Sequence, residues 1–227
     1  MKILFQGDSI TDAFRKPEEI NPAFQLGNGY AFLVAAKLAR DYPGRFDFFN
    51  RGVSGDTVPR LSARWQEDAI ELNPDVLSLL VGVNDTGVSM RGRGGDADNR
   101  FADDYRNLLT ALRKTNPEVR FILVEPFITD VAGCTDGWRP NLLPRQLVIA
   151  EIAREFSAVF VPVQAELDAA LASAPPAYWA YDGVHLTHAG IQILADAWLD
   201  AAGPVLGINP NPAEAGAKSG FVGKGTR

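Results

Sequence analysis

The two histidines of this chain lie in one short segment, and an aspartate stands close to one of them. Asp182 precedes His185 by three residues, which would place both side chains on one face if the segment formed a helical turn. An aspartate that accepts Nδ1–H of a histidine leaves Nε2 free as a base. His188 has no acid at this spacing, and we expect it to open a helix after Thr187. The pattern favours His185 as the base.

Two serines are candidates for the nucleophile that such a base would activate. Ser9 follows Gly7 and Asp8 at the end of an expected strand, where a tight turn can expose the hydroxyl oxygen. The same Gly-Asp-Ser triplet is also typical of an ordinary turn in which a side chain caps the backbone. Ser54 is the rival, although its surroundings lack the last glycine of a Gly-X-Ser-X-Gly motif.

Donors for a developing oxyanion follow the second and third expected strands. Gly55 stands just before an expected helix, where backbone N–H groups point away from the helix and can bind an anion. Asn84 follows the third strand, and its amide could donate to the same oxygen. Each residue also has a simpler interpretation, because glycine and asparagine are both common in turns.

The elements that would position these residues alternate between strands and helices. Apolar runs predict five strands, at residues 3–6, 46–50, 76–81, 121–124 and 159–161. Helical periodicity predicts five helices, at residues 30–40, 58–72, 105–113, 143–156 and 189–201. This alternation predicts one doubly wound α/β domain with helices on both faces of a parallel sheet. Active sites in such folds lie beyond the carboxyl ends of the strands.

The boundaries of the domain and its loops follow from composition. We expect a folded domain over residues 1–205 and a disordered tail over residues 206–227, where apolar residues are few. Two long loops, residues 85–99 and 127–141, interrupt the alternation, and loops of this length are often functional.

Composition excludes several classes of protein. Hydrophobic residues make up 46% of the 227 residues and charged residues 22%, which excludes a disordered chain or a coiled coil. The net charge of -6 argues against nucleic acid or an anionic membrane as the partner. A single cysteine, Cys134, excludes an internal disulfide, and no cluster of Cys and His suggests a metal site. Without a signal-like or membrane-spanning apolar run, we expect a cytoplasmic protein.

Four motifs, in this order, resemble those of the SGNH (GDSL-type) hydrolase family. They are residues 7–10 (Gly-Asp-Ser-Ile), 54–57 (Ser-Gly-Asp-Thr), 82–85 (Gly-Val-Asn-Asp) and 182–185 (Asp-Gly-Val-His). The resemblance extends over about residues 2–202. It implies a flavodoxin-like, three-layer α/β/α fold with a five-stranded parallel sheet, and a serine esterase that needs no metal or cofactor.

The resemblance also implies a role for each matching residue. Ser9 would be the nucleophile, His185 the base and Asp182 the acid that orients His185. The oxyanion hole would consist of the Ser9 N–H group, the Gly55 N–H group and the side chain of Asn84.

Within the family, the chain is most similar to intracellular bacterial acetylxylan esterases. The similarity rests on Gly29 and Tyr30, on residues 55–68 and on an aromatic residue before Asp182. Those relatives remove acetyl groups from xylo-oligosaccharides and form homo-oligomers, so we expect an acetylated sugar as substrate and a homo-oligomer. Trp179 and Tyr181 flank the histidine segment and are candidates for stacking on a sugar ring. Tyr181 stands where those relatives typically have Trp.

Two alternatives remain open at this point. One is a lipid-active esterase, lysophospholipase or thioesterase of the same family, which a preference for long acyl chains would reveal. The other is a non-catalytic carbohydrate-binding protein. The complete set of Ser9, Gly55, Asn84, Asp182 and His185 argues against the latter.

Overall fold

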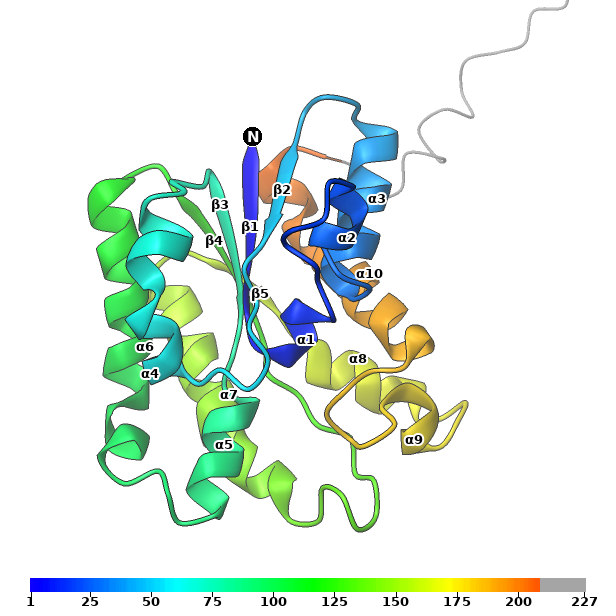
Figure 1. The fold of residues 1–227 in the computed structure, drawn as a ribbon. Coiled ribbons are helices and arrows are strands. Elements are labelled where there is room, and N and C mark those ends of the chain that lie inside the picture. Colours follow the sequence, from blue (N-terminus) through cyan, green and yellow to red (C-terminus); the bar gives the residue numbers. More distant parts are fainter. Residues whose placement is uncertain (209–227) are drawn as a thin grey trace, which may run out of the picture.

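A five-stranded parallel sheet forms the centre of the computed structural model, which describes residues 1–208 (Figure 1). The strands are β1 (Lys2–Gly7), β2 (Asp47–Asn50), β3 (Val76–Leu80), β4 (Arg120–Val124) and β5 (Val159–Val161). Their order in the sheet is β2-β1-β3-β4-β5, and all neighbours are parallel. This confirms the predicted α/β fold, and each predicted strand agrees with the structure to within one residue at either end.

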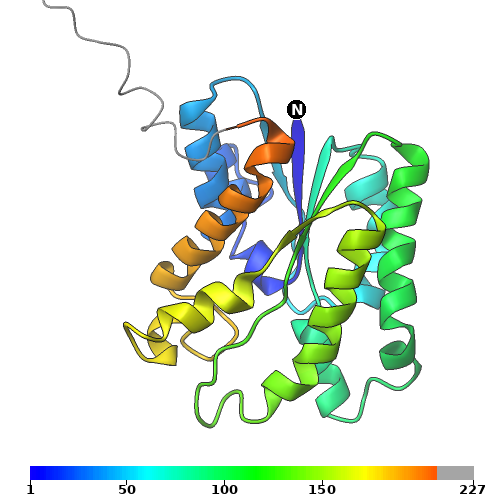
Figure 2. The same ribbon diagram turned by 180° about the vertical axis from the view of Figure 1, so that it is seen from behind.

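Helices cover both faces of the sheet and complete the three layers (Figures 1 and 2). On one side lie α1 (Ser9–Asp12), α2 (Pro22–Gln25), α3 (Tyr30–Asp41), α8 (Val163–Ala170), α9 (Pro176–Trp179) and α10 (His188–Leu206). On the other lie α4 (Val58–Ala63), the π-helical segment η1 (Gln66–Ile70), α5 (Val83–Met90), α6 (Asp96–Thr115) and α7 (Trp138–Glu155). None of these helices in the described part of the chain is long and apolar enough to cross a membrane.

Successive side chains along the strands point to opposite faces of the sheet and belong to two separate hydrophobic cores. Along β1, Ile3 and Phe5 pack with α3 and α10, whereas Leu4 packs with α4, α6 and α7. All five residues of β3 are buried, as expected for a strand that is covered on both faces. Because both faces are covered by helices, side chains at the carboxyl ends of the strands are the ones that remain available for chemistry.

The order of the strands places the functional segments next to each other. The chain leaves β1 toward β2 on one side, and β3 then pairs with the other side of β1. The carboxyl ends of β1 and β3 therefore lie at the point where the direction of winding changes, which is where ligands bind in open α/β sheets. Ser9 follows β1 after Asp8, and Asn84 follows β3.

Several predicted helices and loops differ from the structure, most of all in two segments. The helix expected over residues 58–72 is divided into α4 and η1. The long loop expected over residues 85–99 is mostly helical, because α5 continues to Met90 and α6 begins at Asp96. The connection that remains is short and contains Gly92, whose φ of 66° lies in the left-handed region that ends helices.

The folded domain extends beyond the predicted boundary at residue 205. Helix α10 continues to Leu206 and is capped by Gly207, which has a φ of 61°. Leu206 and Ile208 both belong to the core that covers the first face. Arg45 fixes this end further, because its Nη2 atom donates to the carbonyl group of Leu206 at 2.7 Å. The rest of the predicted tail lies outside the described residues.

Candidate active site

The turn that presents Ser9 is set by its two preceding residues. At Gly7 a β-carbon would collide with the carbonyl oxygen of Leu80 on the neighbouring strand, so only glycine fits there. Asp8 is fully buried and caps α1, because its carboxylate accepts the Ile10 N–H group at 3.1 Å. Ser9 is therefore the first residue of α1 and lines a cavity beyond the end of β1.

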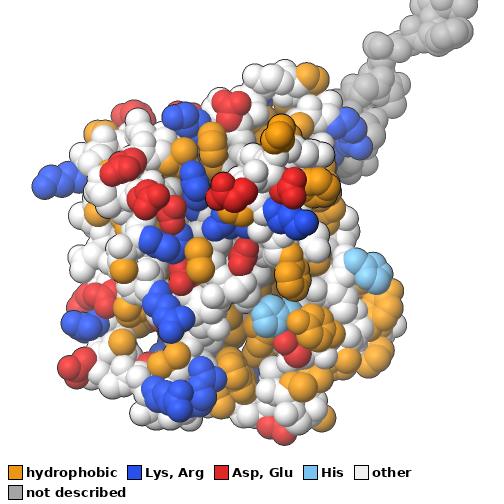
Figure 3. All heavy atoms as spheres, viewed as in Figure 1, with side chains coloured by type: hydrophobic (Ala, Val, Ile, Leu, Met, Phe, Trp, Pro, Cys, Tyr) orange, Lys and Arg blue, Asp and Glu red, His pale blue; other side chains and the backbone are white. Residues whose placement is uncertain are grey.

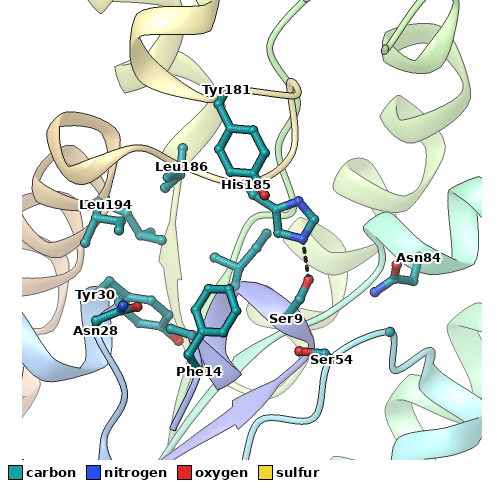
Figure 4. A pocket seen from close by; sticks show the side chains of 15 residues that line it. Ser9, Phe14, Asn28, Tyr30, Ser54, Asn84, Tyr181, His185, Leu186 and Leu194 are labelled. Carbon is teal, nitrogen blue, oxygen red and sulfur yellow. Dashed lines mark hydrogen bonds between the residues drawn. The ribbon is translucent and has the colours of Figure 1, made fainter.

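A hydrogen bond joins Ser9 to His185, in the segment that contains both histidines (Figure 4). Ser9 Oγ lies 2.9 Å from His185 Nε2, although the two residues are 176 positions apart. On the other side of the ring, His185 Nδ1 lies 2.7 Å from Asp182 Oδ2. The structure thus brings together the three residues predicted to act as nucleophile, base and orienting acid. His188 is exposed and opens α10 after Thr187, as predicted.

The pairing of Asp182 with His185 arises from a turn and not from a helix. Asp182 Oδ1 accepts the backbone N–H groups of Val184 and His185, at 3.0 and 2.7 Å. A bridge between Ala180 and Leu186 closes this turn. The helical turn that the three-residue spacing suggested is therefore wrong, although it led to the correct contact.

The protonation of this pair follows from the same contacts. Partial burial acts to raise the pKa of Asp182, but the hydrogen bonds from the backbone and ring of His185 outweigh it and hold the pKa below its ordinary value. Asp182 is therefore ionised at neutral pH and accepts Nδ1–H. This leaves Nε2 of the ring as the acceptor for the hydroxyl proton of Ser9.

Gly55 and Asn84, the predicted oxyanion donors, line the same cavity as Ser9. Asn84 lies near the start of α5, and its amide donates one N–H to the carbonyl oxygen of Asp56 at 3.1 Å. An amide nitrogen has a second hydrogen to donate. Figure 4 shows this amide directed toward Ser9. The site can therefore offer a side-chain donor opposite the hydroxyl group.

A network that sequence reasoning missed attaches the loop of Gly55 to α1. The carboxylate of Asp12 accepts both the N–H and the Oγ–H of Ser54, at 3.1 and 2.5 Å. Next to it, Arg15 Nε donates to the carbonyl oxygen of Gly52 at 2.7 Å. Ser54, the rival nucleophile, is thus held by a carboxylate and not by a histidine. Its contacts indicate a structural role.

Arg64 fixes the other end of that loop. Its guanidinium donates to Asp56 Oδ2 and to the carbonyl oxygen of Arg51, both at 2.7 Å, and to Gln6 Oε1 at 3.1 Å. It also forms an ion pair with Asp68. Because the carbonyl group of Asp56 holds Asn84, Arg64 positions that donor indirectly. The only sequence signal was the spacing of Arg64 and Asp68 on one helix face.

The cavity beside Ser9, which we call the Ser9 cavity, has a volume of about 450 Å³ and a largely apolar lining. Its apolar residues come from α1, α3, α10 and the segments that precede them, namely Ile10, Ala13, Phe14, Tyr30, Leu186, Ile191 and Leu194. Phe14 is 86% exposed at the rim. Ile10 and Tyr30 belong to stretches that carry the family resemblance, but none of these residues was predicted to line a cavity, since apolar residues in helices are ordinarily assigned to the core.

Only one of the two predicted sugar-stacking residues lines this cavity. The ring of Tyr181 stacks on that of His185, with centroids 5.9 Å apart and an interplanar angle of 19°, and it is 62% exposed. Trp179 is not among the lining residues. Its indole N–H donates to the carbonyl oxygen of Ala174 at 3.2 Å, and its ring packs against the core.

Two buried carboxyl groups lie beneath the site. Burial, with a smaller contribution from neighbouring carboxylates, raises the pKa of Asp8 to about 7. Burial likewise raises the pKa of Asp85 to about 6, although Asp85 accepts the N–H group of Val58. Among residues 1–208 no group of three or more His, Cys, Asp or Glu side chains is arranged to hold a metal ion.

Comparison with known proteins finds relatives that match most of this chain. The family of GDSL-like lipases and acylhydrolases matches residues 5–193. The acetylxylan esterase of Geobacillus stearothermophilus is 36% identical over 206 residues, which cover 89% of this chain and 94% of that protein.

Two solved structures are similar over comparable lengths. The crystal structure of Axe2, an acetylxylan esterase from Geobacillus stearothermophilus, is 35% identical with a TM-score of 0.77, over 92% of this chain and 95% of that chain. LAE5, an α/β hydrolase enzyme from the metagenome of Lake Arreo, Spain, is 32% identical with a TM-score of 0.74, over 89% of this chain and 94% of that chain.

Proposed function

This chain belongs to the GDSL-like lipase/acylhydrolase family, and on that premise we propose that it is a serine esterase that removes acetyl groups from carbohydrate esters, acetylated xylo-oligosaccharides among them. The observation that carries this proposal is the hydrogen-bonded series of Ser9, His185 and Asp182 at the mouth of one cavity. Such a series activates a hydroxyl group for attack on an ester carbonyl.

The reaction has two steps, and each uses the same residues. In the first, Ser9 Oγ attacks the carbonyl carbon while His185 Nε2 takes the hydroxyl proton and then passes it to the departing alcohol. The oxyanion accepts hydrogen bonds from the N–H groups of Ser9 and Gly55 and from the amide of Asn84. In the second step His185 activates a water molecule, which releases acetate and restores Ser9.

The choice of an acetylated sugar is supported by two observations. Relatives that cover most of this chain are described as an acetylxylan esterase and as an acetyl-xylooligosaccharide esterase. In addition, the exposed ring of Tyr181 stands over His185 at the cavity mouth, where a sugar leaving group would pass. The homo-oligomer that the resemblance implies remains a prediction.

The lining of the Ser9 cavity favours a second candidate, an esterase or thioesterase for longer acyl chains. Ile10, Leu186 and Leu194 are largely buried and border the cavity. A volume of about 450 Å³ exceeds what an acetyl group needs and lies within the range of ordinary ligand pockets. Acyl-chain dependence distinguishes the two candidates.

The test measures kcat/KM on p-nitrophenyl acetate, butyrate and octanoate and on acetylated xylo-oligosaccharides. We expect a rate that falls beyond acetate and a loss of about 10⁴-fold or more in Ser9→Ala. Ser54→Ala is the matched control, and we expect it to retain activity within about tenfold because Ser54 has no histidine beside it.

The outcomes separate the candidates. A rate that rises with chain length would replace the sugar ester by a lipid or thioester substrate. A Ser9→Ala variant that keeps most of the wild-type rate would remove Ser9 from the mechanism. Failure of the wild type to react with a serine-directed fluorophosphonate, together with no turnover, would favour the non-catalytic carbohydrate-binding protein.

A further inference from the structure

A second hollow adjoins the Ser9 cavity, and its polar lining is cationic. It has a volume of about 470 Å³ and shares Gly55 and Asn84 with the Ser9 cavity. Its other lining residues come from α4, from α5 and from the turn after α5, namely Thr57, Arg60, Val88, Arg91 and Arg93. We call this hollow the arginine groove. Among residues 1–208, no acidic residue lines it.

The three arginines of the groove differ from most others in the described part of the chain. Elsewhere, arginines such as Arg64 and Arg139 form ion pairs with aspartates. Within residues 1–208, Arg60, Arg91 and Arg93 have no carboxylate within ion-pair distance. Arg60 donates only to the carbonyl oxygen of Gly55, at 3.3 Å. On the face shown in Figure 3, Lys and Arg side chains gather over α4 and α5.

Unpaired arginines in one groove stand out in a chain whose net charge is -6. Three like charges repel one another unless an anion lies between them. The guanidinium group is planar, always charged, and matches two oxygens of a carboxylate or a phosphate at once. The groove therefore has the chemistry to bind an oxyanion that the protein itself does not supply.

The backbone that presents two of these arginines is fixed. Helix α5 ends in a Schellman motif, in which the Gly92 N–H donates to the carbonyl of Ser89 at 2.8 Å and the Arg93 N–H donates to that of Val88 at 3.0 Å. Gly92 supplies the left-handed conformation at the centre of this motif. The backbone positions of Arg91 and Arg93, on either side of Gly92, are therefore fixed. Both residues line the groove together with Asn84.

We propose that the arginine groove binds an anionic substituent of the ester substrate, a carboxylate or a phosphate on the sugar whose acetyl group is removed at Ser9. The proposal rests on the proposed esterase function. A saccharide carries a carboxylate when one of its units is a uronic acid, and it carries a phosphate when it is a sugar phosphate. Because the groove shares Gly55 and Asn84 with the Ser9 cavity, an anion bound there would fix the acetylated unit relative to the oxyanion hole.

The test compares three acetyl esters, namely a neutral xylo-oligosaccharide, the same oligosaccharide with a uronic acid side chain, and a sugar phosphate. The readout is the ratio of kcat/KM for each anionic ester to kcat/KM for the neutral one, because a general change in activity does not alter this ratio. We expect at least one ratio to be about 10 in the wild type at low salt and to fall toward 1 as salt is added.

The decisive variant is Arg91→Gln with Arg93→Gln, which should lower that ratio about tenfold. Arg60 is left intact because it contacts the carbonyl group of Gly55. The matched control is Lys114→Gln with Arg154→Gln. It removes the same charge from two exposed residues in the last turns of α6 and α7, which lead to the amino ends of β4 and β5. This control should keep the wild-type ratio.

A binding measurement separates failure of the groove from failure of the proposed function. Calorimetry with the deacetylated uronic acid oligosaccharide, and with inorganic phosphate, requires no turnover. Salt-dependent binding that disappears in the Arg91/Arg93 variant, without esterase activity in the wild type, would overturn the proposed function and support anion binding by the groove. Two results would overturn the proposal that the groove binds an anion. One is normal esterase activity with anionic-to-neutral ratios near 1, and the other is an equal loss of these ratios in the Lys114/Arg154 control variant. Between the two anionic esters, the one with the larger ratio identifies the source of the anion.

Discussion

The Ser9 cavity and the arginine groove share Gly55 and Asn84, yet they are built from different parts of the fold. Apolar side chains from α1, α3, α10 and the turn before α10 line the cavity, and several of them belong to the core. The groove is lined by exposed Arg60 of α4, by residues of α5 and by the exposed turn that follows α5. One hollow is thus an extension of the core, whereas the other lies on the molecular surface.

This difference has consequences for what each hollow can specify. Residues such as Leu194 pack both against the core and into the cavity, so a change there affects stability as well as the acyl group that fits. Arg91 and Arg93 project from a surface turn and can be replaced with little effect on packing. The chemistry is therefore tied to the fold, whereas the proposed recognition of an anionic substituent resides in side chains that contribute little to packing.

The largest effect on activity that would sharpen this comparison is expected at Asn84, which lines both hollows. Asn84→Ala removes a donor to the oxyanion and should lower kcat/KM by about 10²- to 10³-fold. Because Asn84 borders both hollows, neutral and anionic acetyl esters should lose the same factor. The two substrates are assayed side by side with the wild type and with Ser54→Ala. A loss of activity confined to one substrate would show that Asn84 does not serve both substrates in the same way.

A smaller effect is expected from filling the Ser9 cavity alone. Ile191 lines this cavity from α10, so Ile191→Phe should shorten it and lower the octanoate-to-acetate ratio of kcat/KM by about tenfold. The ratio of anionic to neutral acetyl esters should stay constant. Ile193→Phe is the matched control, because Ile193 lies on the same helix but borders a different hollow between α8 and α10. Equal effects of the two substitutions would contradict the assignment of the cavity to the acyl chain.

The residues of the hydrogen-bonded series were predictable because they combine local motifs with strand ends. The apolar runs of β1 and β3 located both strands to within one residue, and parallel strands must end at one edge of the sheet. Ser9 and Asn84 follow those ends within a few residues. The contact of Ser9 with His185 spans 176 positions, and it was expected from the ordered motifs and the family they resemble.

The supporting residues were not predictable, for a physical reason. These contacts join residues that lie far apart in the sequence or on different elements. They are the contact of Asp12 with Ser54 and those of Arg64 with Asp56 and Gln6. No periodicity encodes such contacts, because they depend on how the loops after β1 and β2 pack together.

Two expectations about the surroundings of the site do not match the structure, for two different reasons. Trp179 is two residues from Tyr181, but its ring packs against the core, because the turn before α10 directs the two side chains differently. In the segment expected to be the loop 85–99, the helical residues of α5 and α6 are mixed with glycines and arginines that obscure their periodicity. The short turn that remains there is the one that contributes Arg91 and Arg93 to the groove.

The smallest expected effect concerns the buried carboxyl group of Asp8, which caps α1. Burial raises its pKa to about 7, above the ordinary value of 3.8. Between these values the unfolded chain releases a proton that the folded chain retains, so the free energy of unfolding should decrease as pH rises from about 4 to 7. Asp8→Asn cannot ionise, and asparagine still caps α1. The variant should therefore lose less stability than the wild type over this range, by on the order of 1–3 kcal/mol.

Urea unfolding at pH 5 and pH 8 measures this difference, and Asp47→Asn, at an exposed residue of β2, controls for the substitution itself. Parallel stability curves for wild type and Asp8→Asn would mean that Asp8 is ionised in the folded protein. The octanoate-to-acetate ratio and the anionic-to-neutral ratio should both be unchanged in Asp8→Asn, because Asp8 lines neither hollow. A change in only one ratio would instead mean that the carboxyl group of Asp8 affects the lining of that hollow. The two hollows would then differ in the residues that support them as well as in the residues that line them.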